Sequence, residues 1–124
     1  LTPHDGEYGL LSGHRPDADR IAACRRLAVA LGCVVLLKGS TTVVADAAGD
    51  VLVTMTGDAR LATAGTGDVL SGIIGALQAS GTPALQAAAA GAWIHGRAAH
   101  LGPPVGLVAS DLLDAIPVVL AELT

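Results

Sequence analysis

The chain has 124 residues, a length that fits one domain, and 52% of them are hydrophobic, which is enough material for a single core. Its net charge is -4 and its seven cations are scattered along the chain, which argues against nucleic acid as a partner. It contains no run of 18 uncharged apolar residues, so we expect no membrane span.

Aromatic residues make up only 2% of the chain, so the core must consist of small and aliphatic side chains. The two cysteines, Cys24 and Cys33, are too far apart for a C-x-x-C motif and too few for a disulfide scaffold. We therefore expect reduced, packed cysteines in a cytoplasmic protein. Because the first residue is Leu1 and not Met, we also expect the numbering to begin inside a longer protein.

The first third of the chain predicts two helices and a strand. Thr2 as N-cap and Pro3 at the first helical position predict a short helix to about Leu11. An apolar stripe predicts a second helix over residues 17–31, which Gly32 terminates. Residues 33–37 are continuously apolar, as is typical of a strand covered on both faces in a mainly parallel sheet.

Residues 42–45 and 51–55 are short strand candidates, and the five residues between them predict a hairpin. Residues 66–80 have helical periodicity, with Gly72 and Gly75 on a slim side where we expect another backbone to approach closely. Two further helices are predicted over 83–101 and 110–123, the last with Ser110 as its cap and Pro117 as a site for a kink. The expected fold class is α/β: one domain over residues 1–124, with a mainly parallel central sheet and flanking helices.

Gly65-Thr66-Gly67 stands directly before a predicted helix, where bare backbone amides and the helix dipole can converge on an anion. A ligand-free glycine-rich turn capped by Thr66 fits a bare Gly-x-Gly equally well. Asp68 favours the functional interpretation, because a carboxylate repels a bound phosphate but can take a proton from a substrate hydroxyl. We therefore interpret residues 65–68 as a phosphate-binding loop followed by a catalytic base.

Lys38-Gly39-Ser40-Thr41-Thr42 closes the predicted buried strand, and open α/β sheets bind ligands at the carboxyl ends of their strands. Lys38 is the only lysine, so it either places an ammonium near phosphate or extends to solvent from the strand end. The hydroxyls and amides that follow it would line the same rim.

The histidines carry weaker signals. His4 and Glu7 lie at a strand-to-helix junction, where a capped surface turn is as good an interpretation as a functional site. His95 stands among small residues on a predicted helix and is interpreted as packed and hydrogen-bonded, and His14 and His100 as loop or helix-end residues. We find no H-x-x-x-H or C-x-x-C cluster, so no metal ligands are predicted.

Three segments together resemble the ADP/ATP-dependent NAD(P)H-hydrate dehydratases, a branch of the ribokinase-like superfamily. They are Leu1-Thr2-Pro3-His4-x-Gly6-Glu7, Lys38-Gly39-x-x-Thr42 and Thr63-x-Gly65-Thr66-Gly67-Asp68-Val69-Leu70-Ser71-Gly72. Gly91-x-x-x-His95-Gly96 and Ala109-Ser110-Asp111-Leu112 fit the same likeness, which runs through the whole chain in unbroken order.

The resemblance implies a ribokinase-like three-layer fold and repair of damaged cofactor: removal of water from the 6S hydrate of NADH or NADPH, at the expense of ADP or ATP and with Mg²⁺. By this likeness Asp68 contacts the hydrate and acts as base, and His4 lines the hydrate site. The loop and the likeness together predict the nucleotide-binding residues as Lys38, Gly39, Ser40, Thr41, Thr42, Gly65, Thr66 and Gly67.

The chain departs from the family pattern at three positions: Asp5 replaces Pro, Asp58 replaces Asn, and Ala64 replaces Gly or Ser. We expect Asp58 to add negative charge near the nucleotide. Family members also carry a further amino-terminal half, so the chain resembles only their carboxyl-terminal portion. The expected partners are the hydrate, an adenine nucleotide, and either further copies of the chain or the amino-terminal portion.

Two other functions compete with the dehydratase. A ribokinase-like kinase of a vitamin precursor would use the same base position, although the Thr2–Glu7 and Lys38–Thr42 segments favour the dehydratase. A catalytically silent nucleotide-binding fragment is the other alternative, motivated by the resemblance to only half of the family domain.

Overall fold

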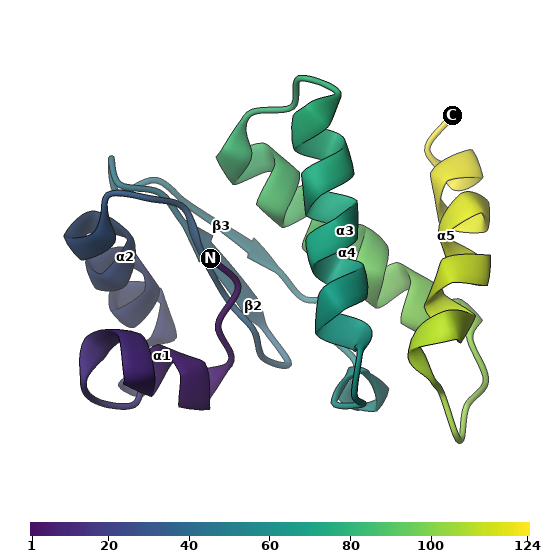
Figure 1. Ribbon diagram of the computed structural model, residues 1–124, viewed down its shortest axis with the longest axis horizontal. Coiled ribbons are helices and arrows are strands. Elements are labelled where there is room, and N and C mark those ends of the chain that lie inside the picture. Colours follow the sequence, from purple (N-terminus) through teal and green to yellow (C-terminus); the bar gives the residue numbers. More distant parts are fainter.

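The computed structural model describes all 124 residues, and its helices lie on both sides of a small sheet (Figure 1). Helices α1 (Asp5–Ser12) and α2 (Arg20–Leu31) lie on one side, and α3 (Thr66–Ala79) and α4 (Ala84–Leu101) on the other. Helix α5 (Ala109–Glu122) packs beyond them against α4 and α3. The α/β class with flanking helices is thereby confirmed, and no helix is both long enough and apolar enough to cross a membrane.

Strands β1 (Val35–Leu37), β2 (Thr42–Ala45) and β3 (Val51–Thr54) form the sheet in the order β1-β2-β3. The predicted hairpin is confirmed, because β2 and β3 pair antiparallel across a five-residue loop. Asp46 organises that loop: its carboxylate accepts hydrogen bonds from the amides of Ala48 and Asp50, both at 3.0 Å.

The expectation of a mainly parallel sheet is wrong for these three strands, since β1 and β2 also pair antiparallel. The connections are the reason, because short loops can join only antiparallel neighbours, whereas a parallel pair requires a crossover of a dozen or more residues. The chain between residues 1–3 and β1 is long enough to allow a parallel pair. Residues 1–3 run alongside β1 in the same direction, and Leu36 and Lys38 donate to the carbonyls of Leu1 and Pro3 at 2.8 and 2.9 Å.

Alternation along the strands divides the core between the two faces of the sheet, as expected for a strand covered on both sides. Val35 and Leu37 of β1 pack with the residues of α2, including the fully buried Cys24. Leu36 points the other way and packs with Leu70 of α3 and small residues of α4. Cys24 is confirmed as a packed residue, since it is fully buried and its thiol hydrogen is shared between the carbonyl oxygens of Val35 and Val43. Burial raises the pKa of this thiol.

The first helix begins later than predicted, and Thr2 is not its cap. His4 is the N-cap: its Nδ1 accepts from the Glu7 amide at 3.1 Å, and the Glu7 carboxylate accepts from the His4 amide at 2.8 Å. Thr2 and Pro3 remain extended because the Pro3 carbonyl pairs with the Lys38 amide beside β1. Sheet pairing therefore outweighs the local capping signal.

The other helix ends differ by a few residues. Helix α2 is capped by Asp19, not begun at residue 17, and Gly32 ends it in the left-handed conformation as predicted. Ser110 does not cap α5, because it lies inside the helix. Val108 is the N-cap residue there, and its amide donates to the Asp111 carboxylate at 2.8 Å. Pro117 lies inside α5 as expected.

The expected close approach at Gly72 and Gly75 is wrong, because no atom lies within 4 Å of the Cβ position of either residue. The close contacts are on α4 instead. A Cβ on Gly91 would lie 2.6 Å from the Ile74 side chain, and one on Gly96 would lie 2.2 Å from the Thr56 carbonyl oxygen. Glycine in α4, and not in α3, brings the elements of this half together.

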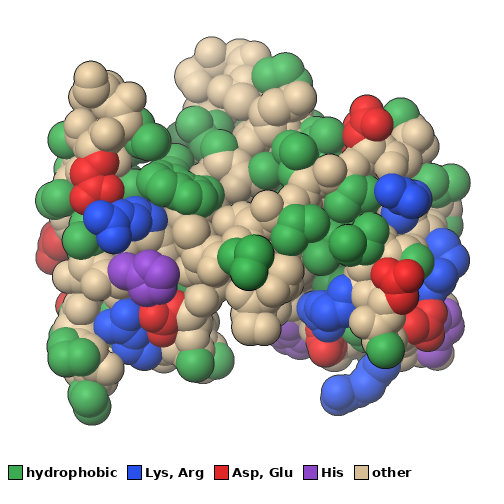
Figure 2. Space-filling view, turned by 180° about the vertical axis from the view of Figure 1, so that it is seen from behind, with side chains coloured by type: hydrophobic (Ala, Val, Ile, Leu, Met, Phe, Trp, Pro, Cys, Tyr) green, Lys and Arg blue, Asp and Glu red, His purple; other side chains and the backbone are tan.

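The surface carries acidic and basic side chains side by side. Figure 2 shows charged and histidine side chains gathered toward two ends of one face, with mostly uncharged surface between them. Ion pairs account for much of this mixture, among them Arg97 with Glu122 at 2.9 Å and Arg26 with Asp17.

Candidate active site

A cavity of about 630 Å³ lies between the β1–β2 turn, the segment before α3, and the first turn of α3. It also reaches α1 through His4 and α4 through Ala92 and His95. The remaining residues that line it are Lys38, Gly39, Ser40, Thr42, Gly57, Asp58, Ala59, Leu61, Ala62, Thr63, Ala64, Thr66, Gly67 and Leu70.

The cavity brings together most of the residues singled out from the sequence. Those that line it are His4, Lys38, Gly39, Ser40, Thr42, Thr66 and Gly67. Thr41, Gly65 and Asp68 belong to the same loops but do not line it. Asp68 instead lies at one end of an apolar groove between α3 and α5, because successive helix residues project about 100° apart.

The start of α3 presents free backbone donors. The amides of Gly65, Gly67 and Asp68 donate to no acceptor within the chain, and no side chain caps the helix. Gly65 adopts φ +86°, in the left-handed region, and a Cβ there would also lie 3.2 Å from Ala109 Cβ. Three N–H groups without acceptors at a helix N-terminus are an arrangement that can bind an anion.

The side chain of Thr66 holds this turn in place. The single hydrogen of its hydroxyl is shared between the carbonyl oxygens of Leu61 and Thr63, which lie 2.6 and 2.8 Å from Oγ1, so the side chain is occupied by contacts within the protein. The Thr66 amide donates to the Thr63 carbonyl at 3.3 Å, and the Thr66 carbonyl accepts from His95. Thr66 therefore shapes the turn and leaves the amides of its two neighbouring glycines free.

Lys38 lies beside the free amides. Its Nζ is 3.5 Å from the position that a Cβ on Gly67 would occupy, and 3.4 Å from Glu7 Oε2. Arg20 holds the main chain here by donating to the Lys38 carbonyl at 2.8 Å and pairs with Asp5, also at 2.8 Å. Of the two interpretations of Lys38, the placed ammonium is the one that this geometry supports.

Glu7, which the sequence left undecided, connects two residues of the cavity. Besides capping α1 it pairs with Lys38 and lies 3.6 Å from His4 Nε2. The hydrogen bond from the His4 amide, followed by the charge of Lys38, holds the Glu7 pKa below its ordinary value. An ionised Glu7 thus keeps the ammonium at the cavity edge.

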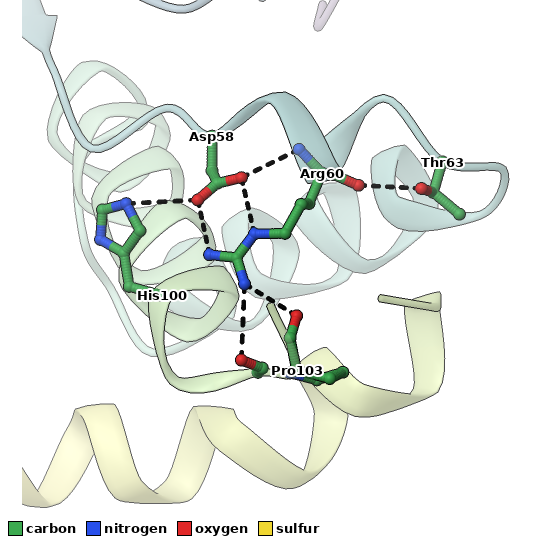
Figure 3. Close-up of polar contacts among 6 residues, drawn as sticks. Asp58, Arg60, Thr63, His100 and Pro103 are labelled. Carbon is green, nitrogen blue, oxygen red and sulfur yellow. Dashed lines mark hydrogen bonds and ion pairs between the residues drawn. The ribbon is translucent and has the colours of Figure 1, made fainter. Parts of the chain in front are cut away.

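Asp58 was expected to add charge near the nucleotide, but its partners neutralise it (Figure 3). Its carboxylate accepts from the Arg60 amide, Nε and Nη2 at 2.9, 2.9 and 2.7 Å, and His100 Nε2 lies 3.5 Å away. The side-chain hydrogen bonds from Arg60 lower the Asp58 pKa strongly. The negative charge is therefore balanced by the adjacent guanidinium.

Arg60 also ties the cavity wall to the far end of α4. Its Nη1 donates to the Pro103 carbonyl at 2.8 Å and to the Gly102 carbonyl at 3.4 Å (Figure 3). Thr63 adds a bond to the Arg60 carbonyl at 2.8 Å. The segment before α3 is thus held by its own residues and by the α4–α5 connection.

Apart from Asp58, which was expected near the nucleotide, residues 57–64 are the part of the cavity that sequence reasoning missed. Gly57 was the available signal: it lies three residues after the end of β3, and a Cβ there would lie 2.4 Å from the Ser40 carbonyl oxygen. Only a glycine lets this segment pass so close to the Lys38–Thr42 loop. His95, by contrast, is packed and hydrogen-bonded as expected, with Nε2 2.8 Å from the Thr66 carbonyl oxygen.

The His, Cys, Asp and Glu side chains of the chain form no group of three that could hold a metal ion. Mg²⁺ is commonly held by one or two carboxylates together with substrate phosphates, so a magnesium ion here would depend on the nucleotide for its ligands.

Comparison with known proteins identifies the family. The family model described as NAD(P)H-hydrate dehydratase matches residues 1–117. The chain belongs to the NAD(P)H-hydrate dehydratase family. This result favours the dehydratase branch over the vitamin-precursor kinases.

Two relatives illustrate the family. The bifunctional NAD(P)H-hydrate repair enzyme Nnr of Mycobacterium leprae is 50% identical over 99% of this chain and 27% of its own length. The ADP-dependent (S)-NAD(P)H-hydrate dehydratase of Neisseria meningitidis is 46% identical over 93% of this chain and 42% of its own length.

Solved structures show the same fold. The ADP/ATP-dependent NAD(P)H-hydrate dehydratase of Bacillus subtilis, co-crystallised with ATP and Mg²⁺, has a TM-score of 0.93 at 31% identity, over all of this chain and 47% of its own. A ribokinase-like superfamily protein of Enterococcus faecalis has a TM-score of 0.80 at 26% identity, over 97% of this chain and 43% of its own. The fold is ribokinase-like, and the chain spans less than half the length of each of these proteins.

Proposed function

We propose that the chain carries the nucleotide site and the catalytic base of an enzyme that dehydrates the 6S hydrate of NADH or NADPH, using ADP or ATP. One observation carries the proposal: free amides at the start of α3 stand beside the Lys38 ammonium at the edge of a cavity. Membership of the dehydratase family supports it. The cavity volume, about 630 Å³, is typical of small-molecule sites.

Each predicted residue has a role in this proposal. The amides of Gly65 and Gly67 bind the phosphate of the donor, assisted by the Lys38 ammonium. Gly39, Ser40, Thr41 and Thr42 complete the nucleotide site, and Thr66 contributes by holding the glycine-rich turn in place through its side chain. His4, which lines the cavity and lies near Lys38 through their shared neighbour Glu7, contacts the hydrate.

The reaction follows from these positions. Asp68 takes the proton of the hydrate's hydroxyl, whose oxygen attacks the terminal phosphorus of the donor, and the bond to the departing nucleotide breaks, releasing AMP from ADP or ADP from ATP. The free amides hold the charge on the transferred group. The carbon–oxygen bond then breaks to release phosphate, and loss of a proton from the adjacent ring carbon forms the double bond.

The carboxylate of Asp68 is available for this role. Asp68 is exposed in the first turn of α3 and makes no hydrogen bond or ion pair within the chain, so no structural partner competes for its carboxylate. Because Gly67 lines the cavity and its chain neighbour Asp68 lines the apolar groove, the proposal requires the hydrate's hydroxyl to lie between these two residues.

Replacing Asp68 tests the proposal. We expect Asp68→Asn to abolish turnover, because an amide keeps the shape of the carboxylate but cannot accept the proton, and to leave ADP affinity within a few-fold. Turnover is followed as the return of dihydronicotinamide absorbance from the hydrate, in a protein that also carries the amino-terminal portion. ADP affinity is measured by calorimetry.

Asp114→Asn is the matched control, since Asp114 is an exposed carboxylate on α5 without a hydrogen bond. It should leave both quantities unchanged. Wild-type turnover in Asp68→Asn would remove Asp68 from the mechanism. Phosphorylation of a vitamin precursor, without regeneration of dihydronicotinamide, would establish the kinase alternative instead.

We further propose that residues 1–124 are the carboxyl-terminal portion of one ribokinase-like domain that acts in the cytoplasm. The share of the relatives that the chain covers supports the first part. The two free cysteines support the second, because reducing compartments keep thiols unpaired.

A further inference from the structure

We propose that His95 is a positioning residue that sets the direction of the Gly67 amide, the central donor of the phosphate-binding turn. The inference rests on the nucleotide site proposed above. His95 comes from α4, 28 residues after Gly67 in the chain, and it makes its contact on the carbonyl side of the turn.

The hydrogen bond from His95 has only one possible direction. Its Nε2 lies 2.8 Å from the Thr66 carbonyl oxygen, and the residue is buried with 7% exposed. Because a carbonyl oxygen can only accept, Nε2 must carry the hydrogen. Burial first, and then the charge of Lys38, lower the His95 pKa, against the opposing effect of the bond to Thr66. A neutral ring with its proton on Nε2 satisfies all of these contacts.

The bond acts on Gly67 through the peptide group. The Thr66 carbonyl and the Gly67 N–H belong to one planar trans peptide unit, so they point in opposite directions. His95 holds the carbonyl on the buried side, and the Gly67 amide, which has no acceptor in the chain, is directed away from it. Donation to the carbonyl also polarises the N–H of the same unit.

Close packing prevents α4 from shifting beneath this contact. Gly96, the neighbour of His95, lies against the Thr56 carbonyl oxygen, and Gly91 lies against Ile74 of α3. Thr56 Oγ1 also donates to the Trp93 carbonyl at 3.4 Å. The imidazole is thus supported on a helix with little room to move, which is what a group that orients another requires.

Three substitutions in the 124-residue chain test the role. His95→Leu removes the donor, His95→Gln can place an amide N–H near the position of Nε2, and His95→Asn is too short to reach. We expect His95→Leu and His95→Asn to weaken ADP binding about three- to tenfold, as expected for one lost hydrogen bond, and His95→Gln to stay within about twofold. Adenosine, which lacks phosphate, should bind all four proteins equally.

An amide spectrum of the ligand-free protein gives a readout that separates this role from the proposed function. The ¹H–¹⁵N resonance of Gly67 should shift in His95→Leu and His95→Asn but stay near its wild-type position in His95→Gln. If wild type fails to bind ADP while this pattern holds, the nucleotide site is wrong and the positioning role stands.

Arg97→Leu is the control. Arg97 lies on the same helix as His95, and its side chain pairs only with Glu122 of α5. The substitution should change neither ADP affinity nor the Gly67 resonance. An unchanged Gly67 resonance in folded His95→Leu would overturn the proposal. If His95→Leu does not fold, the same ADP affinity and the same Gly67 resonance in His95→Gln and His95→Asn would also overturn the proposal.

Discussion

Asp58 shows how the partners of a single side chain decide what its charge does. It lines the cavity, yet three hydrogen bonds from Arg60 occupy its carboxylate, and His100 lies beside it. The side chain is 15% exposed, so these bonds are partly shielded from water. The pair therefore supports the segment before α3 and presents no net charge of its own to a ligand.

This arrangement predicts a pH-dependent contribution to stability. Because the Asp58 pKa is lowered in the folded state, its contribution to the free energy of unfolding is present above the ordinary carboxyl pKa and is lost as the pH falls below it. Asp58→Asn should thus be less stable than wild type by about 1–2 kcal/mol at pH 7. The difference should shrink as the pH falls from about 4.5 to 2.

Urea unfolding across this pH range measures the difference. Asp114→Asn, which removes an unpaired exposed carboxylate, should show almost none at any pH. A constant gap between wild type and Asp58→Asn would mean that the ion pair with Arg60 does not act on stability.

At the scale of elements, α3 and α4 are both rich in small residues, but they use their glycines differently. In α4 the missing side chains allow close packing: Gly91 contacts α3, and Gly96 contacts the segment after β3. In α3, Gly72 and Gly75 face open space. A glycine inside a helix lowers helix stability by about 1 kcal/mol relative to alanine. Close packing offsets this loss at Gly91 and Gly96 of α4 but not at Gly72 and Gly75 of α3.

Two alanine substitutions separate these roles. Gly75→Ala should raise the free energy of unfolding of this chain by up to about 1 kcal/mol, because it adds helix propensity without a clash. Gly96→Ala should lower it by about 1–3 kcal/mol or more, since the new methyl group would meet the Thr56 carbonyl oxygen. Thermal and urea unfolding of both variants give the comparison. Equal effects of the two substitutions would contradict the distinction between the helices.

At the scale of the whole molecule, one side of the α3–α5 half is unusually apolar. A groove of about 690 Å³ runs between these helices, and Leu113 and Leu120 along it are 57% and 43% exposed. The edge strand β3 also leaves Leu52 and Val53 exposed. Surfaces of this kind are typical of a face that another segment covers.

We therefore expect the 124-residue chain alone to show little turnover and to bind an apolar dye such as ANS. Adding the amino-terminal portion of a family relative should restore turnover and reduce dye fluorescence, because that portion would cover the groove and complete the hydrate pocket. The amino-terminal portion alone serves as the control. Full turnover by the purified 124-residue chain would show this expectation to be wrong.

Local signals in the sequence determined much of this protein. Periodicity predicted the helices over 66–80 and 83–101, alternation and turn residues predicted the hairpin over 42–55, and Gly32 marked a helix end. The glycine-rich turn at 65–67 and the Lys38 loop were also recognisable, because each needs only adjacent residues to present amides and a charge. These are properties of neighbours in the chain, so the sequence states them directly.

The tertiary structure alone decided which groups meet. Because Pro3 pairs with Lys38, the N-cap of the first helix is His4 and not the predicted Thr2. The charge of Asp58 is balanced by Arg60. The contact between His95 and Thr66 joins residues 29 positions apart. Burial and hydrogen-bond partners depend on distances between remote segments, and only the packed chain sets those distances.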